Sequence, residues 1–145
     1  MSRLNETKQA YDKVLQLLDQ EIRNRRGSTK DLEKFRETLE VAFYLLGWSQ
    51  FEYLVREEVK VVVEGRARAH TADGQAWRYL LDNVKDVSVR RRLDVLFHAK
   101  PKIRATLDKD YSVRNEAAHN YKKLPPEAKD ISLWLDTLET LISNM

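Results

Sequence analysis

The segment with the clearest capacity for chemistry contains an arginine, an asparagine and a histidine at fixed spacing. Asn115 follows Arg114 directly, and His119 lies four residues beyond Asn115. Arginine binds phosphate oxygens through its planar fork, and histidine can accept or donate a proton near neutral pH. On a helix, Asn115 and His119 share a face, while Arg114 lies on the adjoining flank and is long enough to reach the same anion. The spacing therefore predicts a site the size of a phosphate group.

These residue types are consistent with the cleavage of RNA, the activity that the family resemblance described below implies. RNA carries its own nucleophile in the 2′-hydroxyl, so cleavage needs a group that moves protons and a cation that stabilises the charge developing on the phosphate. His119 can meet the first need and Arg114 the second, while Asn115 can orient the imidazole or bond the ribose. Cleavage by this route leaves a 2′,3′-cyclic phosphate and a 5′-hydroxyl.

Structural interpretations of the same residues stay open. His119 near a helix end can simply favour the C-terminal dipole, and Arg114 can pair with Asp110 one turn earlier. Glu116 is either a surface charge or a group that tunes His119.

The spacing from Arg114 to His119 alone is a pattern expected roughly 0.3 times by chance in a chain of this composition. With Asn after the arginine and Tyr two residues after the histidine, the expectation drops to about 0.0005.

The motif belongs to the fifth of about six predicted helices. The apolar spacing predicts helices over about 5–26 and from a cap at Ser28 to Glu64, followed by a polar loop over 65–74. A short helix capped by Asp73 follows, and the next begins after Asp86 or Ser88. Pro101 opens the helix that carries the motif, and a terminal amphipathic helix covers about 131–142. Gly47, inside the long second helix, predicts a close helix-packing or subunit contact.

Composition agrees with a single all-α domain over residues 1–145, a helical bundle of about five to six helices with one long central helix. Hydrophobic residues make up 42% and charged residues 34%, with only 4 Gly and 3 Pro, which favours amphipathic helices over linkers. Because cysteine is absent, disulfides and a cysteine nucleophile are excluded. The longest apolar stretches are far shorter than the roughly 20 residues that span a bilayer. We therefore expect a cytoplasmic protein with no membrane segment.

The charge balance gives only mild support for an anionic partner, because 26 basic residues face 23 acidic ones for a net charge of +3. Basic residues nevertheless flank the motif and would form an electrostatic funnel for RNA if they cluster, although charge runs are usually solvated faces. They are Arg90, Arg91, Arg92, Lys100, Lys102, Arg104, Lys122 and Lys123. His70 and His98 have no ligand set at metal spacing, so no metal site is predicted.

The motif Arg114-Asn115-x-x-x-His119, with Tyr121 beyond it, resembles the signature of the HEPN superfamily of nucleotide-binding domains. HEPN domains are small helical bundles, and the long second helix, with its segment 45–53, looks like their long core helix. Many members are metal-independent ribonucleases that act as dimers around a shared cleft. By resemblance, Arg114, Asn115 and His119 are catalytic, and neither a metal nor another cofactor is needed. In some HEPN toxins a Tyr at the position of Tyr121 is nucleotidylated; otherwise this residue has a packing role.

The resemblance implies a toxin or defence effector that cleaves RNA as a homodimer. A nucleotidyltransferase-type antitoxin or another regulatory protein is the partner it suggests. The alternative is a non-catalytic HEPN-like module that binds nucleotides, RNA or proteins.

Overall fold

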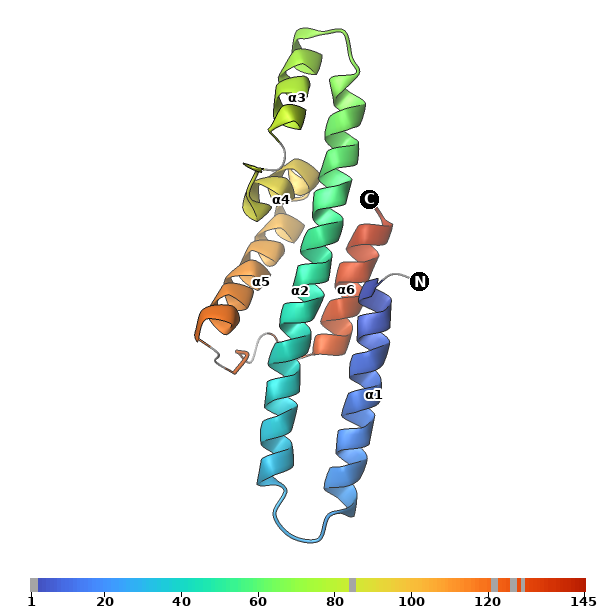
Figure 1. Ribbon diagram of the computed structural model, residues 1–145, viewed down its shortest axis with the longest axis vertical. Coiled ribbons are helices and arrows are strands. Elements are labelled where there is room, and N and C mark those ends of the chain that lie inside the picture. Colours follow the sequence, from blue (N-terminus) through green and yellow to red (C-terminus); the bar gives the residue numbers. More distant parts are fainter. Residues whose placement is uncertain (1–2, 84–85, 121–122, 126–127, 129) are drawn as a thin grey trace. The chain divides into compact units, whose positions relative to one another are not determined.

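The computed structural model describes residues 3–83, 86–120, 123–125, 128 and 130–145 and is entirely helical in its regular structure. No strand occurs among these residues, so the predicted all-α class is confirmed. The long helix that the sequence predicts is α2 (Figure 1). The helices are α1 Arg3–Asn24, α2 Lys30–Ala67, α3 Ala72–Asp82, α4 Val89–Phe97, α5 Pro101–Asn120 and α6 Ile131–Ser143.

The chain forms two compact units, and each is described by itself. The first comprises Met1–Phe51 and Lys109–Asn144, and the second comprises Glu52–Asp108 with the terminal Met145. Helices α2 and α5 each contribute residues to both units. The single domain over 1–145 remains a prediction.

The first unit holds the motif and is built on α1, the start of α2, the end of α5 and α6. Helix α1 packs against α6 (Figure 1). It also meets α2 where the rings of Tyr11 and Phe43 make an edge contact at 5.2 Å. Burial of large apolar side chains is the main stabilising contribution to such a unit. Its buried apolar residues include Leu4, Tyr11, Leu32, Tyr44, Trp48, Phe51, Ala117, Leu124, Ile131, Leu135 and Leu138.

The turn between α1 and α2 departs from the predicted capping arrangement. Gly27 adopts a φ of +114°, which glycine tolerates better than residues with a Cβ. Asp31 does not act in a capping box with Ser28; its carboxylate accepts two bonds from Arg25, at 2.7 and 2.8 Å. The helix begins at Lys30, one residue later than Ser28 would place it. Because the bonds from Arg25 stabilise the ionised carboxylate, they lower the pKa of Asp31.

The second unit shows that the predicted 65–74 loop is wrong in extent. Helix α2 continues to Ala67 and α3 begins at Ala72, so only four residues separate them. The N-cap is Thr71 rather than Asp73, because the Thr71 hydroxyl accepts from Gly74 N at 3.1 Å. Arg78 closes the turn by donating to the carbonyl of Ala67 at 2.8 Å. The local Thr71 cap and the Arg78 contact between α3 and α2 thus extend order into a segment whose composition favours a loop.

Two other predicted helix boundaries are confirmed. Ser88 is the N-cap of α4, with its hydroxyl accepting from Arg91 N at 3.4 Å. Pro101 is the first residue of α5, where its missing N–H costs nothing. Helix α6 is capped by Asp130, whose carboxylate accepts from Leu133 N at 2.9 Å.

In the segments that the structure describes, no helix is both long and apolar enough to cross a membrane.

Gly47 provides a close approach between α2 and α6 within the chain, one of the two alternatives that the sequence left open. A Cβ there would overlap Cδ2 of Leu135 and lie 3.0 Å from Cζ3 of Trp134. Gly65, in the same helix, is a matched control because an added Cβ meets nothing within 4 Å. Both substitutions to alanine gain about 1 kcal/mol of helix propensity, but only Gly47→Ala overpacks a contact, at a cost of roughly 1–3 kcal/mol.

We therefore expect Gly47→Ala to unfold at a lower urea concentration than Gly65→Ala, measured by far-ultraviolet circular dichroism. Equal midpoints would show that Leu135 and Trp134 move aside without cost and that this glycine does not set the distance between the helices.

Candidate functional site

The three motif residues lie in the last two turns of α5, within the first unit. Arg114 and Asn115 are half-buried, while His119 is exposed in the last turn. Because Asn115 and His119 are four residues apart on a regular helix, they share a face, as predicted. The helix thus presents an imidazole to solvent with a carboxamide one turn behind it.

The guanidinium of Arg114 is bound to its neighbour in the motif. Arg114 Nη1 donates to Asn115 Oδ1 at 3.0 Å. The Nε of Arg114 is buried and finds no hydrogen-bond partner among the described residues. The alternative pairing with Asp110 is not formed in this part of the chain, since Asp110 Oδ2 accepts from Trp134 Nε1 at 3.1 Å instead. The bond to Asn115 restricts the guanidinium and leaves the Asn115 Nδ2 group to donate elsewhere.

An aromatic cluster fixes the end of α5 that carries the motif. Tyr44 donates through its hydroxyl to the carbonyl of Asp110 at 3.1 Å, and its ring stacks on Trp134 at 4.1 Å. Trp48 contacts Tyr111 with ring centroids 5.9 Å apart. Helices α2 and α6 therefore hold α5 at two successive residues, one turn before Arg114. The spacing of residues along the sequence gave no signal of the Asp110 contacts.

Asp110 is a mostly buried carboxyl whose environment predicts a pH-dependent stability. Burial raises its pKa, and the hydrogen bond from Trp134 only partly opposes this. The folded chain therefore binds this proton more tightly than the unfolded chain. The stabilising contribution of the Asp110 proton to the free energy of unfolding is fully present below the pKa of the unfolded state, about 4. It is lost as pH rises through the higher pKa of the folded state.

Asp110→Asn removes this titration while keeping an oxygen that can accept from Trp134. We expect the stability of the variant relative to the wild type to increase as pH rises from about 3 to about 7, measured by urea unfolding at each pH. Asp136→Asn, at an exposed position of α6, is the control for loss of one negative charge. A difference that stays constant with pH would contradict the assignment.

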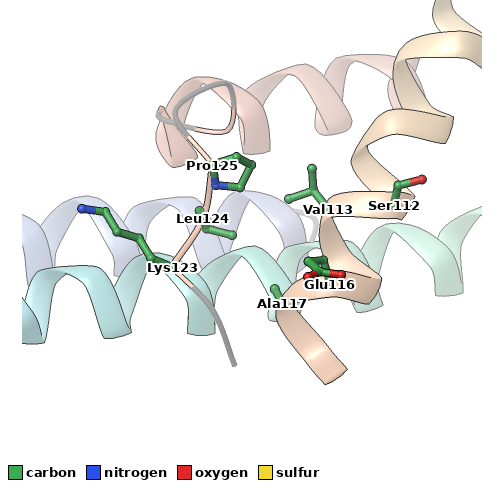
Figure 2. Close-up of a pocket in the computed structure, with 7 residues that line it drawn as sticks. All are labelled: Ser112, Val113, Glu116, Ala117, Lys123, Leu124 and Pro125. Carbon is green, nitrogen blue, oxygen red and sulfur yellow. The ribbon is translucent and has the colours of Figure 1, made fainter. Parts of the chain in front are cut away.

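Glu116 and Lys123 line a pocket of about 390 Å³ beside the motif. Figure 2 shows residues 123–125 running beside the C-terminal half of α5. The apolar walls come from Val113, Ala117, Leu124 and Pro125, and Ser112 completes the lining. The ammonium of Lys123 binds Glu37 at 2.8 Å, which raises the Lys123 pKa. Tyr121 and Lys122, also predicted to belong to the site, lie outside the described residues.

The predicted basic residues of α4 and early α5 belong to the second unit, where carboxylates pair with several of them. Arg104 Nε binds Asp94 at 2.7 Å, and its Nη1 lies 3.4 Å from Asp108. Arg90 pairs with the same Asp108 at 3.1 Å, and Arg91 pairs with Asp94 at 3.5 Å. Two aspartates thus offset much of the positive charge that three arginines would offer to RNA.

The remaining predicted basic residues of this unit differ in exposure. Arg92 is only 6% exposed, and burial, followed by the nearby charge of Arg56, lowers its pKa while Glu52 raises it. Arg92 is therefore a residue of the protein interior and does not form part of an RNA-binding surface. Lys100 and Lys102 are exposed.

The other two histidines do not form a second site. His70 and His98 are exposed, and His98 Nδ1 lies 2.9 Å from the carbonyl of Val95. Across the described ranges, no three or more His, Asp or Glu side chains gather so that they could hold a metal ion.

Comparison with protein-family models, with curated proteins and with solved structures gives no match. The case for a function therefore rests on the motif and on its surroundings in α5.

Proposed function

We propose that this chain is a metal-independent RNA endonuclease of the HEPN type that acts in the cytoplasm as a toxin or defence effector. The observation that carries the proposal is the arrangement at the end of α5. There the Arg114 guanidinium is bonded to Asn115, and the His119 imidazole is exposed one turn beyond. A bidentate cation and a titratable ring on one short stretch of helix suit a phosphodiester with its ribose.

In the proposed reaction the ribose 2′-hydroxyl attacks the adjacent phosphorus. A new bond forms from O2′ to phosphorus, and the bond from phosphorus to O5′ breaks. His119 takes the 2′ proton or delivers a proton to the departing O5′, while Arg114 binds the non-bridging oxygens as their charge grows. The Asn115 Nδ2 group donates to the ribose or the phosphate. The products end in a 2′,3′-cyclic phosphate and a 5′-hydroxyl.

The test is cleavage of RNA by the purified chain in the presence of EDTA. We expect cyclic phosphate ends, and we expect a substrate with one 2′-deoxy sugar at the cut site to resist, because it lacks the nucleophile. Cleavage of the deoxy substrate at the normal rate would refute the mechanism. Binding of RNA or nucleotides with no cleavage of any RNA would instead favour the non-catalytic HEPN-like module.

We also propose that the active form is a homodimer. One motif supplies one imidazole, whereas cleavage benefits from a base for the 2′ proton and an acid for the leaving oxygen. Two motifs related by a two-fold axis would supply both. Ala117 is buried in this chain and Gly47 packs on α6, so neither residue is exposed for a contact between subunits. The contact we propose therefore uses the exposed side of α5 around His119.

Subunit mixing tests the shared site. An excess of His119→Ala chains, added to the wild type under conditions of subunit exchange, should lower specific activity beyond simple dilution, because mixed dimers lack one imidazole. A fully active monomer in sedimentation experiments, or mixed dimers with half of the wild-type activity, would contradict a shared site.

Tyr121 is the proposed point of regulation by a nucleotidyltransferase-type antitoxin. Transfer of a nucleotidyl group to its hydroxyl would add bulk and negative charge two residues from His119, which would hinder an RNA phosphate. Mass spectrometry of the chain after co-expression with its genomic neighbour would detect the added nucleotide.

A further inference from the structure

The pocket beside α5 has a chemistry that the proposed cleavage reaction does not use. Its volume of about 390 Å³ falls within the range typical of small-molecule sites, which combine apolar walls with a few polar groups. Ala117 and Leu124 form buried parts of the wall, being 3% and 8% exposed. Apolar walls of this kind suit a flat, weakly solvated ring. The pocket thus offers room and contacts for a nucleobase.

Two residues that line the pocket, Ser112 and Glu116, lie next to His119 on the helix. Ser112, Glu116 and His119 follow one another at spacings of four and three residues, so they form a single row on α5. All three are exposed. In an RNA strand, a base is joined to the same ribose whose phosphate would lie at His119. A phosphate at the motif therefore leaves a flanking base within reach of Glu116 and the pocket.

Among the residues of this row, the Glu116 carboxylate fits the four bases unequally. An ionised carboxylate has two oxygens and about four lone-pair sites, so Glu116 can accept bonds from a base in addition to its contacts within the chain. Guanine presents two adjacent donors, N1–H and the N2 amino group, on its Watson–Crick edge. Adenine and cytosine present an amino group beside an acceptor nitrogen, and uracil presents N3–H between two carbonyls. On this edge, only guanine donates two hydrogen bonds to a carboxylate. Each of the other bases places an acceptor atom next to its donor, and that acceptor repels the carboxylate.

We infer that this pocket binds a guanine base of the RNA, next to the cleaved phosphate, and that Glu116 is the specificity-determining residue. The inference rests on the proposed ribonuclease function and names its substrate preference. Lys123 lies at the pocket margin, where it is held by Glu37 and points away from Glu116 (Figure 2). Lys123 therefore positions the 123–125 wall and is not assigned a contact with the base.

A binding experiment tests the pocket without cleavage. The probes are the four nucleoside 5′-monophosphates, which share a phosphate and a ribose and differ only in the base. We expect guanosine monophosphate to bind His119→Ala chains roughly tenfold more tightly than the others, as a bidentate contact to a base provides. Adding Glu116→Gln should remove this preference, because an amide offers one acceptor and one donor. Glu57→Gln, an exposed glutamate of α2, is the matched control and should retain it.

A cleavage experiment separates the inference from the proposed function. Sequencing of the ends produced from a random RNA pool should show guanine enriched at one nucleotide flanking the cut, and the ends that Glu116→Gln produces should lack this enrichment. Cleavage with no base preference would overturn the guanine pocket and leave the nuclease standing. Guanine-selective binding that depends on Glu116, with no cleavage of any RNA, would support the pocket while the nuclease fails. Equal binding of all four monophosphates would overturn the pocket in either case.

Discussion

Replacing His119 by alanine is expected to lower the rate of RNA cleavage by about 10²-fold or more, because general acid or base catalysis by a positioned side chain contributes about 10²- to 10⁴-fold. The fold should be retained. His119 is exposed at the end of α5 and leaves no cavity when it is truncated. The measurement is the initial rate on a defined RNA in EDTA, with circular dichroism spectra compared for both chains.

The chain supplies matched controls for this experiment. His70→Ala and His98→Ala remove exposed imidazoles from other segments and should leave the rate unchanged. If His119→Ala cleaved as fast as these two variants, His119 would have only the local role of a charge at a helix C-terminus. Equal loss in all three variants would point to damage of the fold, and equal cleavage by all three and the wild type would also be expected of a contaminating nuclease.

The second large effect is expected for Arg114→Lys, at about 10²-fold in the cleavage rate. Lysine keeps the positive charge but lacks the planar fork that holds two phosphate oxygens, and loss of one donor to the transition state costs about 10²- to 10³-fold. Lysine would also replace the present contact between Arg114 Nη1 and Asn115 Oδ1 with a more mobile one. The motif would lose orientation as well as a donor.

Arg68→Lys is the control for this change, because Arg68 is an exposed arginine between α2 and α3. It should cleave at the wild-type rate. Wild-type cleavage by Arg114→Lys would instead make Arg114 a structural residue of α5. A selective rise in KM with an unchanged kcat would indicate that Arg114 binds the substrate and the transition state equally.

Much of the helical framework can be read from the sequence because its determinants are local. Apolar spacing, the Ser88 cap and Pro101 each act within about one turn of helix, so they predict α4 and the start of α5 without knowledge of any distant contact. The same locality places Asn115 and His119 on one face. At the 65–74 segment the prediction failed because the cap is Thr71 rather than Asp73 and because Arg78 binds the carbonyl of Ala67, a contact between helices that composition does not reveal.

The surroundings of the motif depend on residues far apart in the chain. The hydrogen bond from Tyr44 to the Asp110 carbonyl joins residues 66 positions apart, and Asp110 binds Trp134 rather than Arg114. A sequence shows which side chains can form such bonds, but the choice among competing partners depends on which helices lie together. The same holds for the pocket, which Leu124 and Pro125 line together with residues of α5. Residue types and spacing thus determined the helices and the chemical groups of the motif. Tertiary packing decided the partners of those groups, because desolvation and hydrogen bonding act only between atoms that the fold brings into contact.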